Sequence, residues 1–332
     1  MNKTKKIYIN SLMTAEQVLK PHIITSEILN NKNLNLILSL NHEGWDLVYN
    51  GTENLVKEIC DYNSIDYKKI KFESSNYNPN LTYFDHIQSV PSIYRIIKIP
   101  NNVTDLEYNK YGLFVARPTN ERLHVFLKHV NWEHNNLGLA TFHFDPSFEN
   151  EMESGFVNFL VQYNEGWKKL LKILPYSDFG DYSNRQFDPD RRRHYNVECV
   201  TDVDFWTEVY KKISIEIVCE TVVQNESFYI TEKTIRPILY KRLFLTVAPK
   251  GYEKKLKELG FDIFDDIIDK TYDDKNYHDR VEHVYGSLDY VLRNFEKIKN
   301  SKEINQRLEK NKERMTKYVK DQVNLLFATR NK

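Results

Sequence analysis

The feature that most constrains the fold is a repeated alternation of short apolar runs with amphipathic stretches. Strand-like runs fall at residues 6–10, 34–40, 70–72, 111–116, 213–219 and 243–248. Stretches with helical spacing fall between or after them, at residues 14–29, 55–62, 120–130, 156–174, 200–212, 252–259 and 279–327. Alternation of this kind predicts an α/β protein whose parallel sheets carry helices on both faces.

The pattern restarts near residue 110, and no internal repeat or low-complexity linker interrupts it. We therefore expect two Rossmann-like domains facing a cleft, at residues 1–105 and 106–300, followed by a helical C-terminal extension at 301–332. In open α/β sheets, ligands bind outside the carboxyl ends of the strands, where the next helix begins. Binding residues are therefore expected just after the strands.

Composition excludes some classes of protein. Apolar residues make up 41% of the 332 residues, enough for a sizeable core. Lys+Arg and Asp+Glu both number 47, so the chain lacks the overall positive charge of many nucleic-acid binders. The three cysteines are far apart, which argues against a disulfide framework or a zinc cluster. With no apolar run long enough to span a membrane, the expectation is a cytoplasmic protein.

The segment NESFYITEKTIRP, residues 225–237, follows the strand predicted at 213–219. Thr231 suits an N-cap, so a helix should begin at Glu232, with Pro237 limiting its length. Free N–H groups at the helix start, together with Lys233, suit a diphosphate. Glu232 would repel phosphate but could accept hydrogen bonds from a vicinal diol such as a ribose. The segment therefore fits a nucleoside diphosphate, or alternatively an ordinary helix start.

NESFYITEK resembles a motif of the α-1,3-fucosyltransferase family, whose members have the two-domain GT-B glycosyltransferase fold. The resemblance implies that Asn225, Tyr229, Glu232 and Lys233 contact a nucleotide-sugar donor. The loop between Asn225 and Tyr229 is shorter than in that family. Residues 111–130, YGLFVARPTNERLHVFLKHV, are similar to the family's strand–loop–helix segment, in which an arginine binds the phosphates. Arg122 matches by position, and Arg117 is a rival nearer the strand.

Residues 243–264 resemble the region after that motif, and also segments of phage and viral proteins near these transferases. The likeness covers roughly residues 110–300 and implies inverting transfer without a metal or other cofactor. The base would then be a residue of the first domain, for which Glu43 is the leading candidate, ahead of Asp46, His42 and His86. The triplets at 188–190 and 202–204 have the DxD form of a metal motif, but we interpret the first as part of a turn and the second as the capped start of a helix.

The sequence is compatible with two acceptors, a glycan or a hydroxymethylated base in phage DNA. The DNA acceptor would place the protein in the cytoplasm of a phage-infected cell. A basic loop could clamp DNA phosphates, or could be a solvated loop neutralised by Asp188 and Asp190. The arginines of this loop are Arg191, Arg192 and Arg193. A different class is a non-catalytic nucleotide-binding or scaffold protein. A Rossmann-type sugar-phosphate enzyme is disfavoured, since no GxGxxG follows a predicted strand.

Overall fold

The structure is a computed structural model. It describes residues 3–9, 34–40, 52–74, 81–89, 94, 97–115, 120–142, 176–177, 203–220, 223 and 228–330. The chain divides into two compact units. The first comprises Met1–Arg95, Gln224–Ile230 and Lys320–Lys332, and the second comprises Ile96–Val223 and Thr231–Val319. These bounds differ from the expected divisions after residues 105 and 300, which remain predictions.

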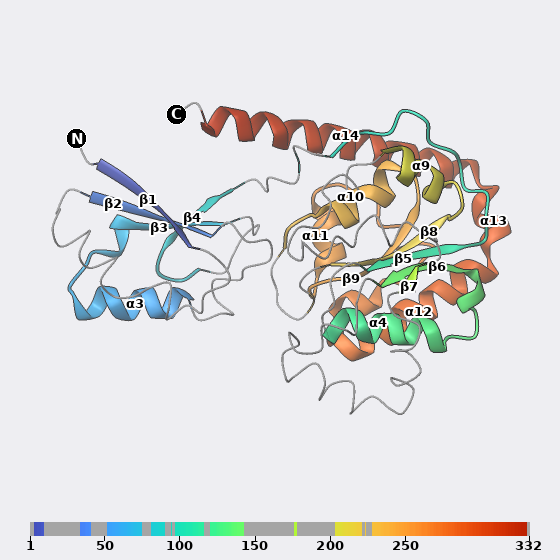
Figure 1. Ribbon diagram of the computed structural model, residues 1–332, viewed down its shortest axis with the longest axis horizontal. Coiled ribbons are helices and arrows are strands. Elements are labelled where there is room, and N and C mark those ends of the chain that lie inside the picture. The colour runs from blue at the N-terminus through green and yellow to red at the C-terminus, as the bar shows by residue number, and fades with distance from the viewer. Residues whose placement is uncertain are drawn as a thin grey trace. The chain divides into compact units, whose positions relative to one another are not determined.

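The first unit contains a four-stranded parallel sheet whose strands follow one another in chain order (Figure 1). Its strands are β1 (Lys3–Ile9), β2 (Leu34–Leu40), β3 (Ile70–Ser74) and β4 (Asp85–Gln88). Helix α3 (Thr52–Tyr62) connects β2 to β3 and packs on the sheet. The buried core here is formed by apolar side chains of α3, β2 and β3: Val56, Cys60, Leu36, Leu38 and Phe72.

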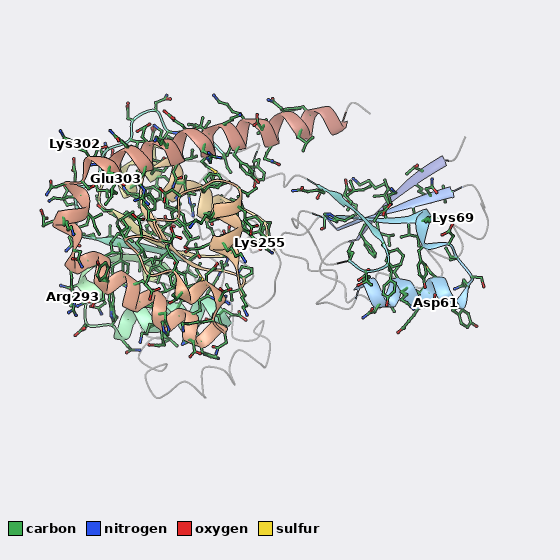
Figure 2. All side chains as sticks on the ribbon, turned by 180° about the vertical axis from the view of Figure 1, so that it is seen from behind. Asp61, Lys69, Lys255, Arg293, Lys302 and Glu303 are labelled. Carbon is green, nitrogen blue, oxygen red and sulfur yellow. The ribbon has the colours of Figure 1, made fainter. Side chains whose placement is uncertain are left out.

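Alternation along β3 shows why this segment forms a strand. Ile70, Phe72 and Ser74 are buried, whereas Lys71 and Glu73 between them are partly exposed. Successive side chains of a strand point to opposite faces, so the apolar pair lies on the core side. The exposed side of α3 carries Asp61, which is visible at the surface of this unit in Figure 2 and accepts a hydrogen bond from Lys57 at 2.5 Å.

The second unit contains a five-stranded sheet with the order β7-β6-β5-β8-β9. Its strands are β5 (Tyr111–Val115), β6 (Gly138–Phe142), β7 (Tyr176–Ser177), β8 (Ile215–Cys219) and β9 (Leu243–Val247). All neighbouring pairs are parallel except β6 with β7. Every residue of β5, β8 and β9 is buried, as expected for strands covered on both faces.

Helices cover both faces of this second sheet, as the sequence pattern predicts (Figure 1). Helices α4 (Asn120–Asn131) and α12 (Tyr277–Arg293) lie on one side. Helices α9 (Val203–Tyr210) and α10 (Glu232–Leu239) lie on the other. The remaining helices of this region are α11 (Tyr252–Glu258), α13 (Phe295–Lys299) and α14 (Lys302–Arg330). The short elements η1 (Tyr67–Lys69), η3 (Asn135–Leu137) and η6 (Thr271–Asp274) are 3₁₀ turns.

Three strands are absent from the sequence prediction. β4 has the sequence DHIQ and lacks buried residues, and β6 begins with a glycine, so neither shows a strand pattern. β7 lies inside the stretch that we expected to be a polar loop, and it forms only by pairing with the end of β6. The helices expected at residues 14–29 and 156–174 lie outside the described residues.

A buried arginine joins the segment before β5 to the rest of the second unit. Arg242 is 2% exposed, and burial lowers the pKa of its guanidinium to about 10. Its Nε donates to the carbonyl of Tyr210 at 2.9 Å. Its Nη1 and Nη2 donate to the carbonyl and the hydroxyl of Thr104, each at 2.8 Å. Uncharged oxygens therefore satisfy this buried cation, and Thr104 belongs structurally to the second unit.

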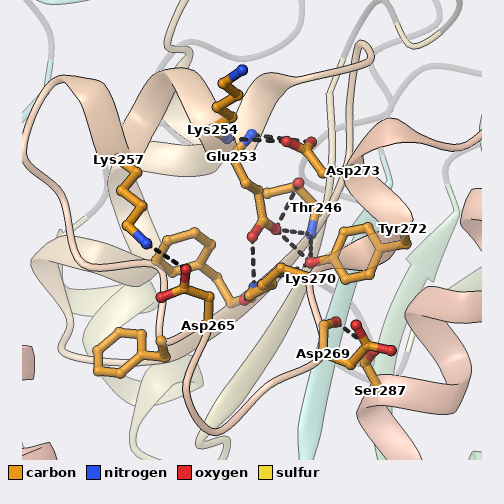
Figure 3. A network of polar contacts seen from close by, with 12 residues as sticks. Thr246, Glu253, Lys254, Lys257, Asp265, Asp269, Lys270, Tyr272, Asp273 and Ser287 are labelled. Carbon is orange, nitrogen blue, oxygen red and sulfur yellow. Dashed lines mark hydrogen bonds and ion pairs between the residues drawn. The ribbon is translucent and has the colours of Figure 1, made fainter.

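A second polar network fixes the start of α11 against β9 (Figure 3). Glu253 is fully buried, accepts from the backbone N–H and hydroxyl of Thr246, and pairs with Lys270 at 2.8 Å. The N-cap of α11 is Gly251, which has no side chain to accept from the first N–H groups. Asp273 supplies the missing capping group, because its carboxylate accepts from the N–H groups of Glu253 and Lys254 at 3.1 and 3.0 Å.

Candidate functional site

The order of the strands in the second sheet identifies where a ligand would bind. From β5, the chain continues to β6 on one side, and later returns to β8 on the other side of β5. Such a reversal leaves a crevice at the carboxyl ends of the two central strands. β5 and β8 pair only through Tyr111 with Ile215 and Gly112 with Glu216, whereas β5 and β6 pair over five residues. The central strands therefore part towards their carboxyl ends.

Helix α10 begins just beyond β8, and its start is held by a buried carboxylate. Thr231 is the N-cap, as predicted, and its hydroxyl accepts from the N–H of Lys233 at 3.2 Å. Glu220, which is 1% exposed, accepts from the hydroxyls of Thr231 (2.8 Å), Thr234 (2.7 Å) and Tyr252 (3.2 Å). These bonds fix the first turn of α10 relative to the end of β8. The sequence pattern could not show this role of Glu220, since it depends on tertiary contacts.

Glu232 and Lys233 occupy the first turn of α10, as predicted. Lys233 Nζ donates to Glu232 Oε1 at 2.9 Å, and both side chains are 14% exposed. Burial alone would raise the pKa of Glu232, but the charges of Lys233 and Arg236 outweigh it and lower this pKa to about 2. Glu232 is therefore an ionised, acceptor-only carboxylate at neutral pH.

Arg122 lies in the first turn of α4, the helix that follows β5, and is 2% exposed. Burial raises the pKa of the Cys219 thiol, at the end of β8, to about 11, and the positive charges of Arg122 and Lys233 both oppose this increase. The two predicted donor-binding cations lie in the first turns of α4 and α10, the helices that follow the two central strands, β5 and β8.

Most of the remaining predicted site residues lie outside the part of the chain that the structure describes. Tyr229 is 2% exposed and belongs to the first unit, so its position is given for that unit alone. Glu43, Arg117 and Asn225, the basic loop at 191–193 and the triplet at 188–190 lie outside the described residues. Of the alternative bases, only His86 is described: its Nε2 is 3.0 Å from the hydroxyl of Ser74, and burial lowers its pKa.

Two arginines near the site have no signal in the sequence analysis. Arg280 on α12 is 3% exposed and donates to the backbone carbonyls of Val223, Ala248 and Lys275, which links the segments that follow β8 and β9. Arg236 on α10 lies over the ring of Trp206, with its Cζ 3.9 Å from the ring centroid. Arg236 lies within the candidate segment at 225–237 and Arg280 within the charged helix expected at 279–327, but the sequence alone assigns a role to neither.

The described residues contain no group of three or more His, Cys, Asp or Glu side chains placed to hold a metal ion. In the same part of the chain, none of the helices is both long and apolar enough to cross a membrane. Glu253, although buried and acidic, already has partners among Thr246, Lys270 and Tyr272. The residues at the ends of β5 and β8 therefore form the candidate site.

No family model matches this chain, and none of the curated proteins matches it. Among solved structures, the chain is similar to a mutant of S. aureus TarM in complex with Fondaparinux, alpha-GlcNAc-glycerol and UDP. The identity is 11% and the TM-score is 0.37. The likeness covers 92% of this chain and 54% of that one, so this chain spans about half the length of TarM. At this level the likeness carries no argument about the site.

Proposed function

We propose that the protein is a glycosyltransferase of GT-B type that transfers a sugar from a nucleoside diphosphate sugar to a hydroxyl acceptor. One observation carries this proposal: Lys233 and the ionised carboxylate of Glu232 are paired in the first turn of α10, the helix that follows β8 in the sheet whose order reverses. A nucleoside diphosphate has the matching groups, a dianionic diphosphate next to a ribose diol.

The diphosphate would bind at the start of α10. Free N–H groups and the helix dipole favour an anion there, and Lys233 adds a full charge. In the unliganded protein, Lys233 is paired with Glu232 at 2.9 Å. A phosphate oxygen would replace Glu232 as the partner of Lys233, while Arg122 would bind the phosphates through its planar fork. Arg117 is the alternative for this second role.

The carboxylate of Glu232, once released from Lys233, would accept hydrogen bonds from the ribose. The resemblance adds Asn225 and Tyr229 as further donor contacts. Transfer would follow an inverting route, in which a base of the first domain, Glu43 in our proposal, removes the acceptor proton. Arg122, Lys233 and the helix N–H groups would then stabilise the leaving diphosphate without a metal.

The acceptor is proposed as a glycan or as a hydroxymethylated base in phage DNA. The DNA alternative assigns the backbone phosphates to the basic loop, Arg191, Arg192 and Arg193. The two acceptors are separated by offering the same radiolabelled donor sugar to a glycan mixture and to hydroxymethylated DNA. Label that becomes attached to only one of them identifies the acceptor.

A thermal-shift panel of nucleoside diphosphates and their sugars, with and without EDTA, tests the donor site. We expect one nucleotide to raise the melting temperature, because a ligand that binds only the folded state stabilises it. EDTA should leave this shift unchanged if no metal takes part. If no nucleotide produces a shift, the proposal is wrong. If a nucleotide binds but its sugar is never released or transferred, the protein is a nucleotide-binding scaffold.

A further inference from the structure

Arg236 has an environment that the proposed phosphate contacts do not explain. It lies one helical turn beyond Glu232, and its guanidinium is held against the ring of Trp206 at 3.9 Å. Its Nε is buried and has no hydrogen-bonding partner among the residues that the structure describes. A buried donor without a partner is destabilising, so such groups are uncommon unless a ligand or water completes them.

Glu232 and Arg236 line the same narrow hollow between α9 and α10. Trp206, Leu239 and Tyr240 provide its apolar wall. The space that a water-sized group can occupy is about 20 Å³. A hollow of this size holds roughly one water-sized group, which excludes a whole phosphate or base.

Three charged residues line this hollow: Glu232, Arg236 and Lys98, of which Lys98 is exposed. The carboxylate and the guanidinium, which lie on the same helix, have opposite hydrogen-bonding character. Ionised Glu232 can only accept, and the guanidinium of Arg236 can only donate. Arg236 is also close enough to Glu232 for its charge to lower the pKa of that carboxylate. A phosphate oxygen would be repelled by Glu232, and an ammonium would be repelled by Arg236. A hydroxyl satisfies both, because it donates its proton and accepts at its oxygen.

We propose that Glu232 and Arg236 together bind one hydroxyl group of the donor's ribose, and that Arg236 is the residue that makes the site specific for a ribonucleotide. The carboxylate accepts the hydroxyl proton, and the guanidinium donates to the hydroxyl oxygen. Trp206 holds the guanidinium flat, so that little conformational freedom is lost when the ligand arrives. This inference rests on the proposed function, because the hydroxyl belongs to the proposed nucleotide.

The test compares ligands that lack one hydroxyl. The dissociation constants of the best-binding nucleoside diphosphate and of its 2′-deoxy and 3′-deoxy forms are measured by calorimetry with the wild-type protein. We expect one deoxy form to bind about tenfold or more weakly, as for a lost hydrogen bond to a charged group. We call the dissociation constant of this deoxy form, divided by that of the parent nucleotide, the deoxy ratio. In Arg236→Met the deoxy ratio should fall several-fold, because one of the two partners of the hydroxyl is gone.

Two further variants separate binding from folding. Arg236→Lys keeps the charge but lacks the planar fork, and Trp206→Leu keeps the arginine but removes its support. Both should lower the deoxy ratio, so the test survives if Arg236→Met fails to fold. Arg293→Met is the matched control, since Arg293 lies at the surface with 68% of its side chain exposed (Figure 2). It should bind all three nucleotides like the wild type.

The outcomes separate this inference from the proposed function. If the nucleotide binds but the deoxy ratio is the same in the wild type and in the Arg236 variants, Arg236 is only a counter-ion and the inference is wrong. If the wild type binds all three nucleotides equally well, the inference is also wrong. If no nucleoside diphosphate binds the wild type, both the function and the inference are wrong.

Discussion

The two sheets are built from similar strands, yet among the strands that the structure describes only those of the second sheet reverse their order. In the first unit, β1 to β4 run side by side in chain order. In the second, the chain leaves β5 in one direction and later returns to its other side. Only a reversal places two helix starts on either side of one crevice. The comparison shows that strand order, more than strand sequence, determines which helix starts follow the two central strands, and Arg122 and Lys233 lie in these helix starts.

The strongest test of this comparison removes two positive charges from helix starts of the second unit and, as a control, one from a strand of the first. Lys233→Ala and Arg122→Ala should each weaken nucleoside diphosphate binding by about 1.5–3 kcal/mol, as for lost charged hydrogen bonds. Lys71→Ala, on β3 of the first unit, is the control, because Lys71 pairs with exposed Asp85 at 2.9 Å. Calorimetric titration measures all three variants. An affinity loss in Lys71→Ala equal to that in Lys233→Ala would contradict the assignment of the site to the second sheet.

A second prediction concerns Glu216, a carboxylate buried within β8. Burial raises its pKa to about 7, although Arg236 and a hydrogen bond from Tyr210 oppose the increase. The folded state therefore binds more protons than the unfolded state between the ordinary value of 4.5 and about pH 7. Stability should accordingly fall as the pH rises through this window, by about 3 kcal/mol.

The Glu216→Gln variant should lack this part of the pH dependence, because it cannot ionise. Urea denaturation at several pH values measures the effect. In Tyr210→Phe, the loss of the stabilising hydroxyl should move the window to higher pH, since the pKa of Glu216 would rise further. If the free energy of unfolding varied with pH in the same way in the wild type and in Glu216→Gln between pH 4.5 and 7, the pKa of Glu216 would not be raised.

A third prediction concerns the short pairing between β5 and β8. At Gly112, an added Cβ would lie 2.6 Å from Phe114 and 2.7 Å from Ile213. Gly112→Ala should therefore destabilise the protein by about 1–3 kcal/mol through overpacking. Gly286→Ala on α12 is the control: nothing lies within 4 Å of its Cβ, so the alanine should stabilise the helix by about 0.5–1 kcal/mol. The denaturant midpoint should therefore fall in Gly112→Ala and rise by less in Gly286→Ala, and equal midpoints would argue against close packing at Gly112.

The smallest predicted effect compares helix starts in the two units. Thr231→Ala should cost about 1 kcal/mol of stability, because it removes the cap of α10 and one hydroxyl from Glu220. It should also weaken nucleotide binding, since Lys233 is in that first turn. Asp66→Ala removes the cap of the exposed turn η1 and should cost about 0.5 kcal/mol or less. If Thr231→Ala bound the nucleotide as tightly as the wild type does, the cap of α10 would not contribute to the binding site.

Local patterns predicted much of this structure. The apolar run LNLILSL forms β2 with the predicted bounds, Leu34–Leu40, because both its length and its composition suit a buried parallel strand. The cap at Thr231 and the helix start at Glu232 were also predicted, because capping chemistry depends on neighbouring residues. The expected strand at 213–219 begins two residues later, at Ile215.

What the patterns could not predict depends on contacts between distant segments. β4 has no strand signal of its own and exists through pairing with β3. The sequence alone assigns no role to Glu220, Arg236 or Arg280, but each contacts residues from other elements of the fold. The position of Arg122 near the end of β8 was implied by resemblance alone, since no local pattern brings α4 and α10 together.

The bonds of Arg242 have a practical consequence for isolating the second unit. A recombinant fragment that starts at residue 106, the first residue of the expected domain, would lack Thr104 and leave Nη1 and Nη2 without those acceptors. Such a fragment should express as insoluble material, or melt well below one that starts at Ile96. The location of a single threonine thus determines where the gene should be cut for crystallisation or isotope labelling of this unit.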